Sequence, residues 1–122
     1  MFITREYLRD NPNHIFVFGD NTLRRGKGGA AALRDEPNTY GFITKILPNN
    51  SNEAFYTIDI YKPIYYVEIE KLKSYISQNL TKTFLISQLG SGLANRHGIF
   101  EKVIEPNIKN DLNEFDNVKF LW

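Results

Sequence analysis

Short apolar runs alternate with helical patterns along this chain, and that alternation constrains its fold most. Residues 14–18 and 83–87 are rich in β-branched and aromatic side chains, which is typical of buried strands. Residues 41–46 predict another strand, and residues 118–122 predict a final one. Strands that alternate with helices favour a mostly parallel sheet with helices on both faces. We therefore expect a three-layer α/β fold.

Three segments between these strands predict helices. Residues 30–36 have high helix propensity and should end near Pro37, because proline disfavours a helical residue before it. Apolar residues recur at helical spacing over residues 63–76, with charged residues on the other faces. Residues 100–112 carry a further apolar stripe, which Pro106 should kink or divide into two short helices.

Length and composition limit the classes of protein that remain. A chain of 122 residues predicts a single domain over residues 1–122, and a net charge of +1 gives no reason to expect duplex nucleic acid as a partner. The absence of cysteine excludes disulfides, thiolate nucleophiles and cysteine metal sites. Two histidines without ligand spacing predict no metal, and we expect no cofactor. No apolar run reaches the roughly 18 residues of a membrane span, so we expect a cytoplasmic protein.

A glycine-rich loop over residues 19–30 follows the first predicted strand. Glycines let backbone N–H groups point into a concave site, and a helix amino terminus adds unpaired donors, so both suit phosphate oxygens. Arg24, Arg25 and Lys27 lie in the same loop and add positive charge. The alternative interpretation is a flexible connection with a solvated basic tip.

A second glycine-rich loop, residues 88–95, also follows a buried strand. The carboxyl ends of parallel strands meet at one edge of a sheet, so the two loops are expected to lie together. Two such loops could hold both phosphates of a diphosphate, with binding in the micromolar range of about −8 kcal/mol. The sequence therefore predicts a diphosphate site.

Familiar phosphate and nucleophile motifs do not fit these loops. A P-loop needs four residues between its first glycine and Gly-Lys, whereas six separate Gly19 from Gly26. Residues 26–31 match a loose dinucleotide pattern but begin well after the strand, without the acidic residue expected about 20 positions later. Ser91 is not in a G-x-S-x-G elbow, so it has no motif support as a nucleophile.

The order of these motifs resembles that of macrodomains, and more narrowly that of small macro-like proteins of phages and bacteria. The resemblance lies in the strand at residues 15–18, the Gly-Asp-Asn turn at 19–21, Gly-Gly-Ala-Ala at 28–31 and Leu-Gly-Ser-Gly-Leu-Ala at 89–94. It implies a macrodomain-like fold that binds ADP-ribose or a related NAD-derived nucleotide. The aspartate that contacts adenine in that family has no clear counterpart after an early strand here.

The resemblance also implies roles for individual residues. Asn21 would contact the distal ribose, residues 28–30 would approach that ribose and one phosphate, and residues 90–94 would wrap the diphosphate. The implied ligand-binding residues are Gly19, Asn21, Arg24, Lys27, Gly28, Gly29, Ala30, Thr44, Gly90, Ser91, Gly92, Leu93 and Ala94.

Three functions remain open from the sequence. An enzyme would hydrolyse an ADP-ribosyl linkage, with Asn21 orienting the ribose for a phosphate-held water, or with Lys27 or Lys45 acting beside Asp20. A phage-type binder would sequester a cyclic ADP-ribose-like signalling nucleotide without catalysis. An interaction module would use the glycine loops structurally. For the first two, the expected partner is a small nucleotide, with no membrane and with nucleic acid only as an ADP-ribosylated substrate.

Overall fold

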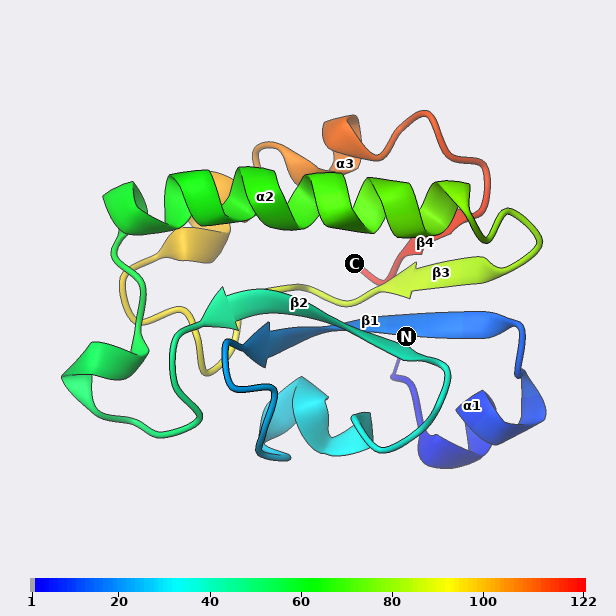
Figure 1. Ribbon diagram of the computed structural model, residues 1–122, viewed down its shortest axis with the longest axis horizontal. Coiled ribbons are helices and arrows are strands. Elements are labelled where there is room, and N and C mark those ends of the chain that lie inside the picture. Colours follow the sequence, from blue (N-terminus) through cyan, green and yellow to red (C-terminus); the bar gives the residue numbers. More distant parts are fainter. Residues whose placement is uncertain (1) are drawn as a thin grey trace.

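A parallel four-stranded sheet forms the centre of the computed structural model, which describes residues 2–122 (Figure 1). Its strands are β1 (His14–Asn21), β2 (Thr39–Lys45), β3 (Thr83–Ile86) and β4 (Val118–Phe120). They lie in the order β2-β1-β3-β4, and each neighbouring pair is parallel. The expected α/β class and the predicted positions of the four strands are confirmed.

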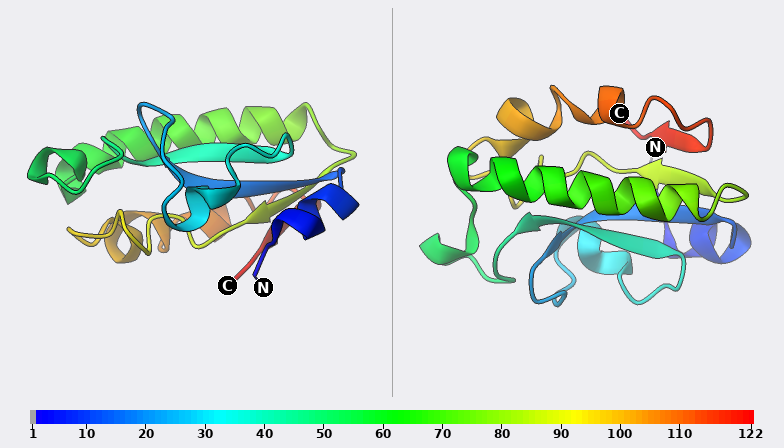
Figure 2. Two further views of the ribbon diagram at one scale, coloured as in Figure 1. Left: turned by 90° about the horizontal axis from the view of Figure 1, so that it is seen from below. Right: turned by 45° about the horizontal axis from the view of Figure 1, so that its top comes forward.

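Helices cover both faces of the sheet, so the three layers are also confirmed (Figures 1 and 2). One face is covered by the long helix α2 (Ile58–Ser77), the π-helical turn η3 (Phe100–Ile104) and α3 (Ile108–Asp111). The other face carries α1 (Arg5–Asp10) and the 3₁₀ helix η1 (Gly29–Leu33).

The central strand β1 explains why its sequence is apolar at successive positions. Ile15 and Val17 point into the core beneath α2, whereas Phe16 and Phe18 point into the core beside α1 and η1. Alternate residues of a strand face opposite sides of a sheet, so a strand covered on both faces needs apolar residues at every position. β1 ends in Asp20 and Asn21, which are also buried.

Some helix boundaries differ from those predicted. The helix expected over residues 30–36 is the short η1, which is held by i,i+3 bonds such as that from the Arg34 N–H to the Ala31 carbonyl. Helix α2 begins at Ile58, and Pro63 lies inside it, near its exposed start. The predicted division at Pro106 is confirmed, because η3 and α3 lie on either side of it.

Two short helical segments were not predicted. Helix α1 begins after Thr4, whose Oγ1 accepts the Tyr7 N–H at 3.0 Å, a cap that the threonine could have indicated. The 3₁₀ turn η2 (Asn52–Ala54) lies between β2 and α2. No helix in the described part of the chain is both long enough and apolar enough to span a bilayer.

Candidate functional site

The two glycine-rich loops line one cavity of about 480 Å³ at the carboxyl ends of β1, β2 and β3. Leu93 of the second loop lies against the first, because its Cδ1 atom would be 3.3 Å from a Cβ atom on Gly28. The predicted site residues that line the cavity are Gly19, Asp20, Asn21, Gly28, Gly29, Ala30, Thr44, Lys45, Gly90, Ser91, Gly92, Leu93 and Ala94.

Small residues are needed where the strands end beneath this cavity. A Cβ atom on Gly19 would lie 2.9 Å from Thr44 Oγ1, so a side chain there would displace the Thr44 side chain of β2, and it would come into van der Waals contact with the Gly90 nitrogen at 3.7 Å. Gly90 has a φ of +79°, which favours glycine. In contrast, a Cβ atom on Gly92 would meet nothing within 4 Å, so that backbone faces open space.

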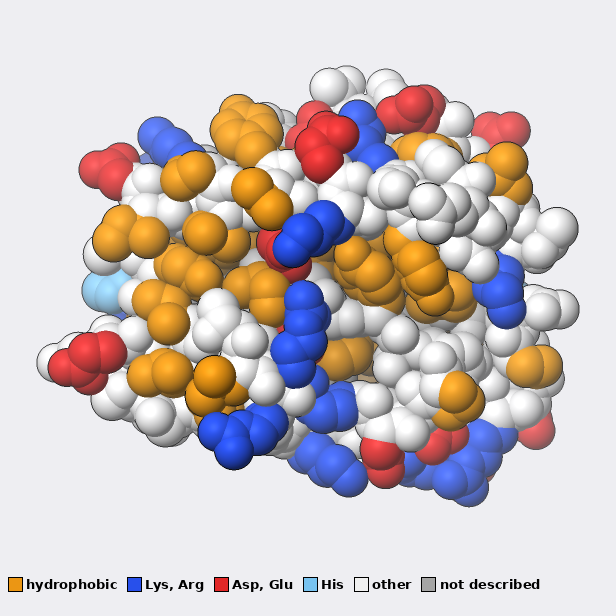
Figure 3. Space-filling view, viewed as in Figure 1, with side chains coloured by type: hydrophobic (Ala, Val, Ile, Leu, Met, Phe, Trp, Pro, Cys, Tyr) orange, Lys and Arg blue, Asp and Glu red, His pale blue; other side chains and the backbone are white. Residues whose placement is uncertain are grey.

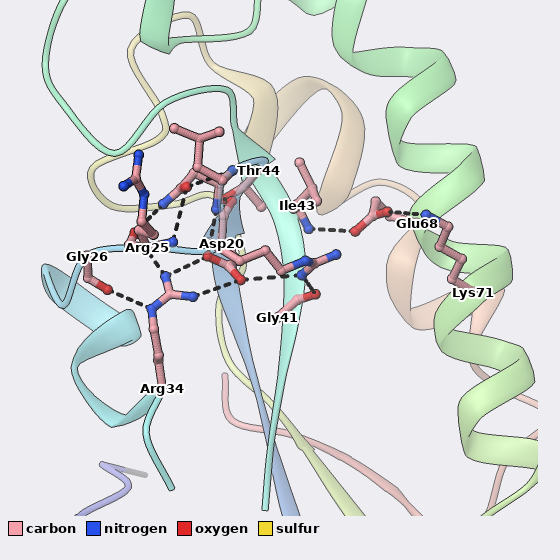
Figure 4. A network of polar contacts seen from close by, with 12 residues as sticks. Asp20, Arg25, Gly26, Arg34, Gly41, Ile43, Thr44, Glu68 and Lys71 are labelled. Carbon is pink, nitrogen blue, oxygen red and sulfur yellow. Dashed lines mark hydrogen bonds and ion pairs between the residues drawn. The ribbon is translucent and has the colours of Figure 1, made fainter. Parts of the chain in front are cut away.

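The carboxylate of Asp20 is fully engaged beside the cavity (Figure 4). Arg34 donates to it twice, from Nη2 to Oδ1 at 2.6 Å and from Nη1 to Oδ2 at 3.1 Å, and Arg24 Nη1 donates to Oδ2 at 3.3 Å. The backbone N–H of Asn21 donates to Oδ1 at 2.8 Å. The side chain of Asp20 is 2% exposed, so its charge is neutralised by these arginines rather than presented to a ligand.

Arg34 also fixes the shape of the first loop. Its Nε donates to the Gly26 carbonyl at 2.7 Å, and its Nη2 donates to the Arg25 carbonyl at 3.2 Å. The Asn21 amide completes the loop, because Nδ2 donates to the Arg25 carbonyl at 2.6 Å and Oδ1 accepts the Leu23 N–H at 3.1 Å. The side chain predicted to orient a ribose is therefore hydrogen-bonded within its own loop.

Two predicted site residues do not line the cavity. Arg24 donates to the Gly41 carbonyl at 2.8 Å as well as to Asp20, and Lys27 Nζ pairs with Asp35 at 3.3 Å. Lys and Arg side chains gather in a band across the middle and lower part of the face seen in Figure 3. Arg25, in contrast, reaches the cavity wall.

Several lining residues were not predicted individually as site residues. Gln88 and Leu89 lie in the predicted second loop, and Ser87 directly precedes it after β3, so the strand-end argument could have named all three. Pro48 comes from the segment after β2, which carries no local signal for a site. The lining residues without an individual site prediction are Arg25, Gly26, Gln88 and Leu89, which lie in the two predicted loops, and Ala31, Pro48 and Ser87, which lie outside them.

Lys45, at the end of β2, is a buried cation in the cavity wall and is only 9% exposed. Its Nζ lies over the Phe55 ring, 4.8 Å from the centroid, and the Arg96 guanidinium lies over the same ring at 3.8 Å. Burial lowers the pKa of Lys45, and the positive charge of Arg96 lowers it further. Arg96 itself is held by Asn52 Oδ1 at 3.1 Å and by the Asn50 carbonyl at 3.4 Å.

An apolar hollow of about 560 Å³ adjoins the cavity. It shares Gly29, Ala30 and residues 87–88 with the cavity wall, and Phe2, whose side chain is 89% exposed, is among its lining residues. Its other apolar lining residues are Ile3, Phe16, Ala32, Leu33 and Leu121. The combined site thus has a glycine-rich polar part and an apolar part.

The donor types present suit oxyanions rather than metal ions. Within residues 2–122, no cluster of three or more histidine, aspartate or glutamate side chains is arranged to hold a metal. The residues that line the cavity instead include Gly92, whose Cα atom faces open space, and the cationic residues Arg25 and Lys45. Such groups bind phosphate or carboxylate oxygens.

Comparison with known proteins gives one match. The model of a family of unknown function (DUF7831) matches residues 1–97, which include β1, β2, β3 and both glycine-rich loops. No curated protein and no solved structure matches the chain.

Proposed function

The chain belongs to the family of unknown function DUF7831, and we propose that it binds ADP-ribose or a related NAD-derived nucleotide between its two glycine-rich loops. The observation that carries the proposal is that Gly28 and Gly92, from loops more than 60 residues apart in the sequence, line one cavity. Ligands of parallel α/β sheets bind at the carboxyl ends of the strands, where this cavity lies.

The diphosphate would lie between the loops. Gly92 has open space around its Cα, so the backbone can approach a phosphate closely. The cavity of about 480 Å³ is within the range of roughly 300–1,000 Å³ that small-molecule sites occupy. Leu93 would close over the ligand from its place beside Gly28.

The nucleobase would occupy the adjoining apolar hollow. This hollow shares Gly29 and Ala30 with the cavity, so a nucleotide whose phosphates contact the loops would extend past these residues to place its base there. Phe2 offers an exposed ring on which a base can stack. No acidic side chain lines the hollow among the described residues, so an adenine there would be held by stacking rather than by a carboxylate.

Capture without cleavage is the second candidate, and the bonding of the proposed catalytic residues favours it. Asp20 is held by two arginines, Asn21 by its own loop, and Lys27 by Asp35 outside the cavity. Of the four residues expected for hydrolysis, only Lys45 has no hydrogen-bond or ion-pair partner within the described chain. A protein that sequesters a cyclic ADP-ribose-like nucleotide needs none of these groups to be free.

Calorimetric titration with ADP-ribose tests binding. We expect micromolar affinity, about −8 kcal/mol. Gly92→Val should weaken binding by more than tenfold, because the valine side chain would occupy the open space between the loop and the ligand. The fold should tolerate the substitution, since a Cβ atom at this position meets no other atom within 4 Å. Thr81→Val, in the exposed turn before β3 at the opposite end of the sheet, is the control. Absence of both heat and a thermal shift in the wild-type protein would refute nucleotide binding.

The fate of the nucleotide separates the two candidates. Wild-type protein is incubated with ADP-ribosylated peptide and, separately, with a cyclic ADP-ribose isomer, then denatured and analysed by chromatography. Intact nucleotide recovered in proportion to protein supports capture. Release of free ADP-ribose over time supports hydrolysis.

A further inference from the structure

We infer that Lys45 forms an oxyanion subsite in the cavity wall and binds a phosphate group of the ligand. This inference deepens the proposed function and rests on it for the identity of the nucleotide. The subsite itself is argued from the surroundings of one side chain.

Lys45 is a buried cation without a counter-charge. Within residues 2–122, no ion pair or hydrogen bond involves its ammonium group. Every fully buried side-chain nitrogen or oxygen of the described chain has a hydrogen-bond partner. The Lys45 nitrogen has none, so it is not fully sealed from solvent, and the residue lines the cavity.

The nearby acid does not supply the missing charge. Asp20 is the one acid among the described lining residues, and its carboxylate is bound by Arg34 and Arg24. The strand register places Lys45 beside Asn21 rather than beside Asp20. A lysine–aspartate pair is therefore not formed in this structure.

The remaining neighbours add positive charge and rigidity. The Phe55 ring lies against the Lys45 ammonium and against the Arg96 guanidinium, and Arg96 is tied to Asn50 and Asn52. Arg25 reaches the same cavity from the first loop. A buried cation is costly unless it is paired, so the ligand group that fits here is an anion. In a diphosphate nucleotide that group is a phosphate.

Two substitutions separate charge from shape. We expect Lys45→Met to weaken binding of ADP-ribose and of inorganic pyrophosphate by about 10- to 100-fold, the usual effect of losing a hydrogen bond to a charged group. Lys45→Arg should restore most of the affinity, because it keeps the charge. Lys82→Met, in the turn before β3 and away from the cavity, should leave both affinities unchanged.

The outcomes distinguish this inference from the proposed function. If wild-type protein binds ADP-ribose and Lys45→Met binds it equally well, the subsite is refuted and the nucleotide site stands. If ADP-ribose does not bind but pyrophosphate binds in a Lys45-dependent way, the subsite stands and the nucleotide assignment fails. If neither binds, both fail. A covalent adduct on Lys45, trapped with cyanoborohydride and ADP-ribose and located by mass spectrometry, would overturn the anion-binding role in favour of a nucleophile.

Discussion

Arg34 and Asp20 form a two-point contact in which Nη2 donates to Oδ1 at 2.6 Å and Nη1 donates to Oδ2 at 3.1 Å (Figure 4). Asp20 lies at the end of β1, and the third guanidinium nitrogen of Arg34 binds the Gly26 carbonyl. One side chain thus attaches the first glycine-rich loop to the sheet. The cavity wall depends on this attachment.

Replacing Arg34 with methionine should destabilise the protein and loosen the loop. The substitution leaves the buried Asp20 carboxylate with one arginine, Arg24, and the Asn21 backbone N–H, and breaking a buried ion pair costs about 3 kcal/mol. Urea unfolding measures the loss. Lys27→Met, which removes an exposed pair with Asp35, should change stability little. Equal effects of the two substitutions would contradict the role of Arg34 in attaching the first glycine-rich loop to the sheet.

Gly90 and Gly92 should respond oppositely to alanine although they share one loop. At Gly90, φ is +79° and a Cβ atom would lie 2.7 Å from Ile104 Cδ1, so Gly90→Ala should cost about 2–4 kcal/mol. At Gly92 the added methyl group meets nothing, so Gly92→Ala should change the free energy of unfolding by less than about 0.5 kcal/mol. Thermal and urea unfolding of both variants check the contrast.

The sequence was sufficient for features that depend on local patterns. The apolar run at residues 14–18 predicts a buried strand, which the structure covers on both faces, and the strand-end rule then placed both glycine-rich loops at one edge. Pro106 divided the last helical stripe as its chemistry requires. These predictions succeed because neighbouring residues determine them.

The roles of charged residues in the site depended on contacts between distant segments. Nothing local to Arg34 indicates that it reaches back 14 positions to Asp20. Likewise, nothing local to Lys45 indicates that its ammonium lies over the Phe55 ring, which also contacts Arg96. Asp20 and Lys45 were therefore expected to act together, whereas the structure gives Asp20 different partners.

Phe2 should contribute to nucleotide binding but not to stability. Its ring is 89% exposed, so Phe2→Ala should leave the unfolding midpoint unchanged. Loss of a stacked base should weaken ADP-ribose binding by about 1–3 kcal/mol. Pyrophosphate has no base, and its affinity should not change. Calorimetry with both ligands tests this assignment. An equal loss of affinity for both ligands would show that the base does not stack on Phe2 in the hollow.

Acid should weaken the contact between α1 and the segment after η1. Glu36 Oε1 accepts from Arg9 Nε at 3.0 Å, and Oε2 accepts from Arg5 Nη1 at 2.7 Å. The hydrogen bond from Arg9, followed by that from Arg5, lowers the pKa of Glu36 below its usual 4.5. The stabilisation is therefore complete above that value and is lost as pH falls through the lowered pKa. Glu36→Gln should be less stable than wild type at neutral pH, with the difference shrinking in acid, whereas exposed Glu70→Gln should show neither effect.

The affinity for a phosphate ligand should depend on pH through Lys45. In the ligand-free protein, burial and then the positive charge of Arg96 lower the pKa of Lys45 below the usual lysine value of 10.5, while a bound phosphate would favour the charged form and raise the pKa again. The other charged groups near the subsite are Arg25 and Asp20, and Asp20 is already paired with arginines.

Affinity should therefore be highest near neutral pH and fall as pH rises through the lowered pKa, with proton uptake on binding in that range. Calorimetry in two buffers of different ionisation enthalpy, at neutral pH and over a series of rising pH values, measures both effects. Lys45→Arg should bind with nearly constant affinity over the same range, because arginine does not titrate there. A wild-type profile as flat as that of the arginine variant would show that the phosphate does not contact Lys45.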